Sequence, residues 1–276
     1  MGSAEDIPAH VALPAGVDGD GPILEARGIT KSFGHVEALR GADFSARPAE
    51  VTALIGDNGA GKSTLVKILS GVYKADAGEI LIRGRKVSFD SPAAAHAAGI
   101  ETVYQDLSVA QDLTPAANMF MGREKLLPGL LGRLGFLDNA AMRRESLVAF
   151  QRLKVSLKDM DTPVASLSGG QRQSVAISRA ILWARSVVFM DEPTAALGVV
   201  QTGRTLDLIR RIRDTGIAVV LISHNMRDVI QVADVIEVLR LGRRIARMPN
   251  QGVTVQDLVG AMTGALDADA EERTST

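Results

Sequence analysis

The stretch GDNGAGKST, residues Gly56–Thr64, constrains the fold of this chain more than any other feature. It fits the pattern G-x-x-x-x-G-K-[ST], in which flexible glycines let backbone N–H groups surround phosphates while a lysine and a hydroxyl reach phosphate oxygens and Mg²⁺. Such a loop requires a strand before it and a helix after it. EVTALI (Glu50–Ile55) reads as a buried strand, and KSTLVKILSG (Lys62–Gly71) has apolar residues at helical spacing. The sequence therefore predicts an α/β fold that holds a nucleotide by its phosphates.

Each position of this loop is expected to contact the nucleotide. We expect Lys62 to reach the β and γ oxygens and take part in catalysis, and the Ser63 hydroxyl to bind Mg²⁺. The expected nucleotide contacts in the loop are Gly56, Asp57, Asn58, Gly59, Ala60, Gly61, Lys62, Ser63 and Thr64.

Two further apolar runs end in polar side chains. VVFMDEP (Val187–Pro193) predicts a buried strand that delivers Asp191 to the metal, while Glu192 faces the γ-phosphate and orients or deprotonates the attacking water. AVVLISH (Ala218–His224) predicts a second strand. In a parallel sheet His224 lies at the carboxyl edge, where ligands of open α/β sheets bind, and we expect it to take part in catalysis by stabilising γ-phosphate charge or holding the water. These elements together predict ATP hydrolysis.

The stretch LSGGQ (Leu167–Gln171) offers a hydroxyl, unhindered amides and the start of a helix predicted over Gln171–Trp183. These features predict an anion-binding site, because the N-terminus of a helix presents free N–H groups and the positive end of the helix dipole. Because the Lys62 loop already surrounds one nucleotide, we expect Ser168 and Gly170, with their neighbours Gly169 and Gln171, to contact ATP held by a second chain.

These elements, in this order and with Gln105 in VYQDL, resemble the ATP-binding cassette family over roughly residues 23–263. The chain looks like the ATP-binding subunit of an ABC transporter. The resemblance implies a P-loop NTPase of ABC type: an α/β fold with a mixed sheet core, an N-terminal antiparallel β-subdomain and an inserted α-helical subdomain. It also implies that Gln105 links metal and water to a membrane subunit, and that Phe33 stacks on adenine, although a lone aromatic at a strand end is as often a core residue.

A narrower resemblance rests on Val87–Leu107, Ala116–Glu124 and the EPTAAL variant. These are similar to monosaccharide importer ATPases of the ribose, xylose and fructose type, here as a single cassette. AALG (Ala195–Gly198) departs from the SALD common in the family, so Gly198 replaces the aspartate that helps to couple two ATP sites, and that coupling stays open.

The resemblance also implies cofactors and partners. We expect ATP and Mg²⁺, ABC permease subunits, a second copy or a similar cassette and, indirectly, a periplasmic or extracellular solute-binding protein. Met119, Phe120 and Met121 are expected in the core or at an interface, and the region after Gln105 is the expected docking groove for a membrane subunit. Open alternatives are another small solute, export, a soluble ABC ATPase that acts on nucleic acid or ribosomes, and a module that senses ATP without useful hydrolysis.

Composition limits the remaining possibilities. The chain has 276 residues and no cysteine, which excludes disulfides and thiolate sites. It has no apolar run long enough to span a membrane, and its acidic, Pro/Gly-rich start lacks signal-peptide features, so we expect a peripheral protein on the cytoplasmic face of the inner or plasma membrane. No nucleic-acid partner is expected, because the basic clusters Arg210–Asp214 and Leu241–Arg247 lack interleaved aromatics.

The same composition suggests the domain limits. We expect flexible tails over residues 1–21 and 266–276 and one ATP-binding domain over residues 22–265. Its helical subdomain is expected over about 107–179, with Thr114–Met121 and Asn139–Leu153 as the clearest helices.

Overall fold

The computed structural model describes residues 21–106, 108–157, 159–195 and 197–264. The two predicted tails, apart from Gly21, lie outside the described residues, as does Leu107 at the predicted start of the helical subdomain. The strands are β1 (Leu24–Phe33), β2 (Val36–Ala46), β3 (Val51–Ile55), β4 (Ala77–Ile82), β5 (Arg85–Val87), β6 (Ile100–Val103), β7 (Val187–Asp191), β8 (Ala218–Ile222), β9 (Val235–Arg240) and β10 (Arg243–Pro249). The helices are α1 (Lys62–Leu69), α2 (Pro92–Ala97), α3 (Pro115–Phe120), α4 (Leu130–Arg133), α5 (Asn139–Arg152), α6 (Gly169–Trp183), α7 (Val199–Asp214), α8 (Met226–Val232) and α9 (Val255–Thr263), with a 3₁₀ turn over Val164–Ser166.

The central sheet has six strands in the order β10-β9-β3-β8-β7-β6, parallel except for the antiparallel β10. Its inner strands are apolar at almost every position because helices or a second sheet cover both faces. In β8, Ala218 and Val220 pack with α1, whereas Val219 and Leu221 pack with α6, α7 and α8. The carboxyl ends of β3, β7 and β8 therefore meet at one edge between two packed layers.

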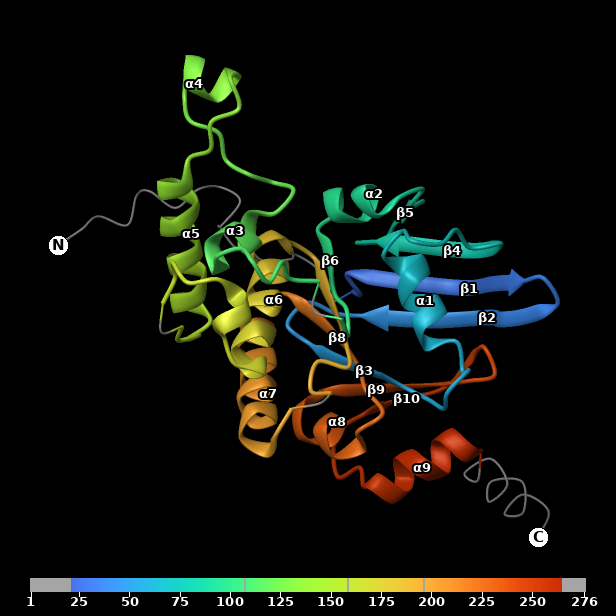
Figure 1. Ribbon diagram of the computed structural model, residues 1–276. Coiled ribbons are helices and arrows are strands. Elements are labelled where there is room, and N and C mark those ends of the chain that lie inside the picture. Colours follow the sequence, from blue (N-terminus) through green and yellow to red (C-terminus); the bar gives the residue numbers. More distant parts are fainter. Residues whose placement is uncertain (1–20, 107, 158, 196, 265–276) are drawn as a thin grey trace, which may run out of the picture.

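A second sheet, antiparallel and ordered β2-β1-β4-β5, packs over α1 (Figure 1). Helix α1 buries Leu65, Val66, Ile68 and Leu69 in an apolar cluster that contains residues of both sheets. Its close fit under β2 needs a glycine at its start. Gly61 has φ 104°, and a Cβ there would lie 2.7 Å from the carbonyl oxygen of Ala38.

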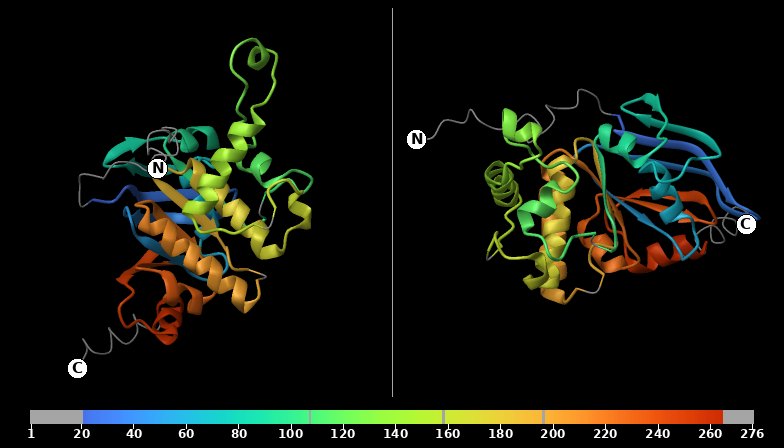
Figure 2. Two further views of the ribbon diagram at one scale, coloured as in Figure 1. Left: turned by 90° about the vertical axis from the view of Figure 1, so that its left-hand side faces the viewer. Right: turned by 45° about the horizontal axis from the view of Figure 1, so that its top comes forward.

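Helices α3, α5 and α6 form a helical subdomain with its own core, set beside the central sheet (Figure 1). Thr114 caps α3, which begins with Pro115, and Asp138 caps α5. A proline at the first position and a side-chain oxygen at the cap both favour helix starts. The helices predicted over Thr114–Met121 and Asn139–Leu153 are thus present, each slightly shorter than expected. Between them, a hairpin that contains α4 rises from the body in two views (Figure 2).

The sequence-based fold class is confirmed: a mixed α/β core, an antiparallel β-subdomain and an inserted helical part. Several boundaries differ by a few residues. Strand β8 ends at Ile222, so His224 lies in the loop after the strand. Helix α6 begins at Gly169, two residues before the predicted start, because Ser168 and Gln171 form a reciprocal capping box. Helix α1 ends at Leu69, two residues before Gly71.

Candidate functional site

The loop between β3 and α1 has the shape its glycines predict. A Cβ at Gly56, where φ is 151°, would lie 2.1 Å from the carbonyl oxygen of Leu239, so no side chain fits. The Lys62 ammonium donates to the carbonyls of Gly56 (2.6 Å) and Asp57 (2.9 Å), which closes the loop on itself. The first main-chain bond of α1 runs from the N–H of Leu65 to the carbonyl of Gly61. The amides before Leu65 thus have no acceptor within the helix and remain available to an anion.

Strand β7 ends at Asp191, and the chain turns sharply at the next residue. Glu192 has φ 50°, in the left-handed region that residues other than glycine rarely adopt. Its N–H donates to the carbonyl of Ile222 at 2.9 Å, at the end of β8. This bond fixes the backbone of Glu192 against the neighbouring strand, and the unusual φ turns its side chain away from the direction that a continued strand would give.

The Glu192 carboxylate contacts His224 twice through one oxygen. Oε1 lies 2.9 Å from the backbone nitrogen of His224 and 2.7 Å from its Nδ1. Because a carboxylate oxygen only accepts, this geometry places the imidazole hydrogen on Nδ1. The Glu192 side chain is 15% exposed and that of His224 is 75% exposed. The pair therefore has one half-buried and one open member, as expected if the ring faces a ligand.

Charge interactions join Lys62, Asp191 and Glu192. Burial lowers the pKa of Lys62, while Glu192, Asp57 and Asp191 act to raise it. Burial raises the pKa of Asp191, and the charge of Glu192 adds to this effect, whereas Lys62 and Lys67 oppose it. The structure thus brings together Lys62, Asp191, Glu192 and His224 at the carboxyl ends of β3, β7 and β8. We call this place the phosphate edge.

Sequence reasoning missed a buried pair behind the phosphate edge. The Thr194 hydroxyl donates to Asp228 Oδ2 at 2.7 Å, and both residues are buried. Thr194 lies two residues after Glu192, and Asp228 lies four residues after His224 on α8. The bond therefore ties the segment that carries Glu192 to the segment that carries His224. The spacing of an acid four residues after a histidine was the one available signal in the sequence.

Phe33 and Gln105 are exposed and lie outside the contacts of the phosphate edge. Phe33 ends β1 with an exposed ring, edge-on to Tyr73 at 5.3 Å between centroids. It is therefore not a core residue, and its ring is open to a flat ligand. Gln105 follows β6, in which Val103 lies opposite Met190 of β7. Gln105 is exposed and makes no hydrogen bond among the described residues, so it lies near the edge without contacting it.

The signature residues Ser168–Gln171 start α6 away from the Lys62 loop. The Ser168 hydroxyl accepts from the N–H of Gln171, and the Gln171 side chain accepts from the N–H of Ser168. Gly170 adjoins Gln201 of α7. Helices α1 and α6 pack on opposite faces of the central sheet. The structure therefore does not bring the two predicted phosphate sites together within one chain.

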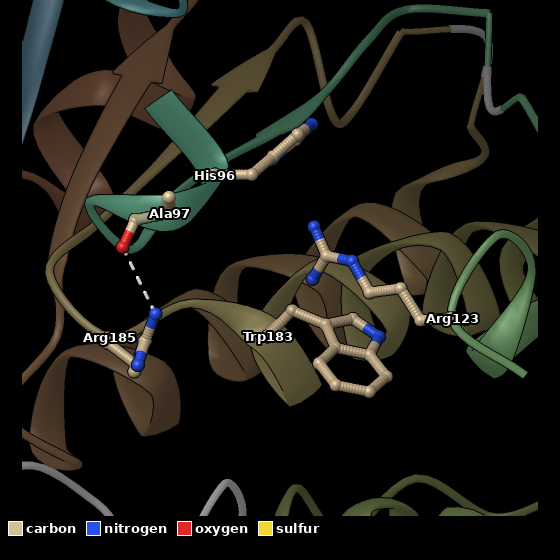
Figure 3. A pocket seen from close by; sticks show the side chains of 5 residues that line it. All are labelled: His96, Ala97, Arg123, Trp183 and Arg185. Atoms are coloured by element: carbon tan, nitrogen blue, oxygen red, sulfur yellow. Dashed lines mark hydrogen bonds between the residues drawn. The ribbon is translucent and has the colours of Figure 1, made fainter. Parts of the chain in front are cut away.

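A cleft of about 330 Å³ lies between α2 and the end of α6 (Figure 3). Its lining residues are His96, Ala97, Arg123, Trp183 and Arg185.

Contacts among these residues and their neighbours form the wall of the cleft. The Arg123 guanidinium stacks over Trp183 at 4.8 Å and donates to Glu101 at 2.8 Å. Phe120, expected in the core or at an interface, is fully buried and meets Trp183 edge-on at 5.6 Å, and Met119 is also fully buried. Both are core residues that support the cleft from behind, and of the expected three only Met121 is exposed.

Comparison with known proteins agrees with this architecture. Residues 39–195 match the family model described as ABC transporter. The chain belongs to the ABC transporter family. It is 47% identical to the fructose import ATP-binding protein FrcA of Rhizobium meliloti, with 91% of this chain and 97% of that protein covered. It is 44% identical to the ribose import ATP-binding protein RbsA of Chromobacterium violaceum, with 86% of this chain but 47% of that protein covered.

Solved structures match the whole cassette as well. An ATP-binding cassette of an ABC transporter in its ADP conformation aligns with a TM-score of 0.72 and 25% identity, covering 88% of this chain and 95% of that one. The predicted ABC-type fold is therefore confirmed for this ABC cassette. Among the residues that the structure describes, no helix has the length and apolarity needed to cross a membrane.

Proposed function

We propose that this chain hydrolyses ATP to drive a membrane permease that imports a monosaccharide. The observation that carries the proposal is the phosphate edge, where the Glu192–His224 pair faces the closed Lys62 loop. The family membership and the high identity to a fructose import ATP-binding protein and a ribose import ATP-binding protein support the sugar assignment.

The residues at the phosphate edge have different roles in the transfer of the phosphoryl group to water. Lys62 uses two of its three N–H groups within its loop, so one stays available for a phosphate oxygen. Glu192 accepts the proton of the attacking water, and His224 holds that carboxylate in place and offers its ring to the γ-phosphate. Gln105 approaches from β6, and Phe33 presents its ring to the adenine. Preorganised donors of this kind stabilise the charge of the transition state.

The donor set at the phosphate edge fits Mg²⁺. Asp191 and Ser63 would hold the ion through oxygen ligands, which this hard cation prefers. Burial and the neighbouring charge of Glu192 raise the pKa of Asp191, and a cation beside this carboxylate would act in the opposite direction. The described residues contain no group of three or more His, Cys, Asp or Glu side chains able to hold a metal. When bound, Mg²⁺ neutralises phosphate charge and orients the γ-phosphate.

The start of α6 completes the site of another chain. Ser168, Gly169, Gly170 and Gln171 would meet the γ-phosphate of ATP that a second copy or a similar cassette holds. ATP would then favour the closed pair of chains by its higher affinity for that state. Hydrolysis would release the pair, and this cycle would move the permease. Gly198 leaves the start of α7 without a side-chain cap, and it offers no carboxylate to couple the two sites of the pair.

The cleft that Trp183 and Arg123 line is the proposed place of the permease. It is concave, it has an aromatic wall and three basic side chains, and it borders β6, the strand that leads to Gln105. A permease segment in this cleft would lie at the cytoplasmic face of the membrane. A solute-binding protein on the other side would act through that permease alone.

Uptake of labelled monosaccharides tests the function directly. Cells that lack this chain would be complemented with the natural sequence, with Glu192→Gln or with Glu79→Gln, an exposed carboxylate of β4 that serves as the matched control. We expect one sugar to be taken up with the natural chain and with Glu79→Gln, and not with Glu192→Gln. Uptake that Glu192→Gln restores in full would refute the proposal. If cells that lack the chain take up every sugar as well as complemented cells do, and the chain still hydrolyses ATP, the sugar assignment is wrong. Other solutes, export and a soluble role would then be tested.

A further inference from the structure

The segment between α3 and α5 forms a narrow projecting hairpin, here called the α4 hairpin (residues 125–138). The N–H of Asp138 donates to the carbonyl of Lys125 at 2.7 Å, and that of Leu127 donates to Phe136 at 2.9 Å. Gly132 packs so tightly that a Cβ would lie 1.8 Å from the carbonyl oxygen of Leu127. The hairpin is therefore a folded element, and it rises clear of the body in Figure 1 and in the left view of Figure 2.

The tip of this hairpin is apolar and exposed. Residues 126–137 read LLPGLLGRLGFL, with Arg133 as the one charged side chain. Exposed apolar clusters on soluble proteins mark sites of protein or membrane contact. The large apolar side chains of the tip, each between 42% and 70% exposed, are Leu126, Leu130, Leu131, Leu134, Phe136 and Leu137.

The distribution of these side chains indicates which partner they meet. Leu130 and Leu131 are adjacent in one helical turn, Leu134 follows at its end, and Leu126, Phe136 and Leu137 on the two arms are exposed as well, so the exposed apolar side chains extend from the arms to the turn of the hairpin. A lipid interface accepts an apolar tip on all sides and favours a cation beside it. Residues 126–137 contain Arg133 and no acidic residue, which suits anionic headgroups.

The position of the hairpin agrees with a membrane contact. It begins at Lys125, two residues after Arg123, which lines the cleft described above. Under the proposed function, on which this step rests, that cleft faces the permease. The adjoining hairpin then reaches toward the same bilayer. Lys125 pairs with Glu145 of α5, which anchors the base of the hairpin to the helical subdomain.

We propose that the α4 hairpin inserts its apolar tip into the headgroup region of the membrane beside the permease. The chain would thereby have a direct lipid contact in addition to its protein partner. This contact needs neither ATP nor the permease.

The absence of cysteine allows a direct test on the full chain. Leu134→Cys would carry an environment-sensitive fluorophore, and Val259→Cys on α9, far from the hairpin in Figure 1, would be its matched control. The probes are vesicles of phosphatidylcholine alone and vesicles mixed with phosphatidylglycerol. We expect the label at 134 to shift to the blue with the anionic vesicles, and the label at 259 to stay unchanged.

Unlabelled variants measure the contribution of the tip. Leu130→Asn combined with Leu134→Asn should reduce the vesicle-bound fraction at least tenfold, an order-of-magnitude estimate from the loss of buried apolar area. Val255→Asn combined with Val259→Asn, which changes two exposed valines of α9, should leave it unchanged. Arg133→Gln should weaken binding to anionic vesicles by roughly fivefold, the typical effect of one basic residue near such a surface. Circular dichroism would check that each variant folds.

Three results would overturn the inference. One is no shift at position 134 with either vesicle, and another is full binding by the Leu130/Leu134 variant. The third is a shift that grows with protein concentration in the absence of vesicles, because it would make a second copy the partner. Since no nucleotide or permease is present, any of these outcomes would leave the proposed ATPase activity standing.

Discussion

The phosphate edge and the start of α6 both offer hydrogen-bond donors to a phosphate, and they are held in different ways. At the phosphate edge, residues at three strand ends come together, and the Glu192 side chain bonds to His224 across 32 residues of sequence. At the start of α6, the side chains of Ser168 and Gln171 each accept a hydrogen bond from the backbone N–H of the other residue. The first region is assembled by the fold of one chain. The second is a local structure, and its donors have no phosphate-binding partner within the described part of its own chain.

The largest expected effect tests the phosphate edge itself. Glu192→Gln keeps the size of the side chain and an oxygen for His224 but removes the base. ATP hydrolysis should fall by about two to four orders of magnitude, the range for a positioned general base. ATP binding should persist, so kcat should fall while nucleotide affinity stays near the natural value. Steady-state phosphate release and equilibrium binding of a labelled ATP would measure the two quantities. Near-natural turnover would remove Glu192 from the role of base.

The second prediction tests whether the start of α6 serves another chain. Gly169→Glu adds a side chain where no atom lies within 4 Å, and an acid at a helix N-terminus favours the helix, so the fold should persist. Its carboxylate would repel the γ-phosphate. Activity of Gly169→Glu alone, and of Lys62→Ala alone, should fall by at least about a hundredfold.

A mixture of these two variants separates the alternatives. In equal amounts they should recover about a quarter of natural activity, because half of the randomly formed dimers would contain one intact composite site. Phosphate release at several mixing ratios is the measurement. Recovery would place Ser168–Gln171 on the partner's nucleotide. A mixture as inactive as its components would contradict independent composite sites.

The third prediction tests the buried support of the phosphate edge. Thr194→Val leaves Asp228 without its hydrogen-bond partner, which should lower stability by about 1–3 kcal/mol. Because the bond ties the Glu192 segment to the His224 segment, kcat should also fall, by roughly tenfold, with little change in KM for ATP. Thr194→Ser keeps the hydroxyl and is the matched control. Loss of stability with unchanged kcat would make the bond purely structural.

The smallest expected effect lies at the boundary between the sheet and the helical subdomain. The hydrogen bond to Glu101 raises the pKa of His96, although its partial burial acts in the other direction. A group whose pKa is raised by folding stabilises the fold at pH values below its unfolded pKa, and the gain disappears as pH rises through the folded pKa.

The variant His96→Gln should therefore lower Tm by a few degrees near about pH 5.5 and by less near about pH 8.5. Thermal unfolding at several pH values is the measurement, and His35→Gln, an exposed histidine between β1 and β2, is the control. An equal Tm difference at both pH values would mean that the His96–Glu101 pair contributes nothing that depends on charge.

Much of the fold could be predicted from the sequence because the evidence for it is local. Strand β7 and strand β8 are short apolar runs buried on both faces, and α3 and α5 carry their caps at Thr114 and Asp138. The glycines of the Lys62 loop are required where φ is positive or where a backbone approaches closely. Each of these features can be recognised from residues that are close together in the sequence.

What could not be predicted depends on residues far apart in the sequence. The Thr194–Asp228 bond spans 34 residues, and neither side chain alone indicates it. Met119 and Phe120 read equally well as core or as interface until the position of Trp183 is known. The α4 hairpin reads as a short apolar run that could be buried, and only its position away from the body shows that it is exposed.

The left-handed backbone at Glu192 has a consequence for any effort to make this protein more durable. Such a φ costs any residue with a Cβ about 1–2 kcal/mol relative to its preferred conformations. Glycine would relieve that strain at position 192 but would remove the carboxylate. Selection for thermal resistance alone would therefore favour a replacement that abolishes ATP hydrolysis. A screen of stabilised variants should reject any change at this position unless turnover is measured for each variant.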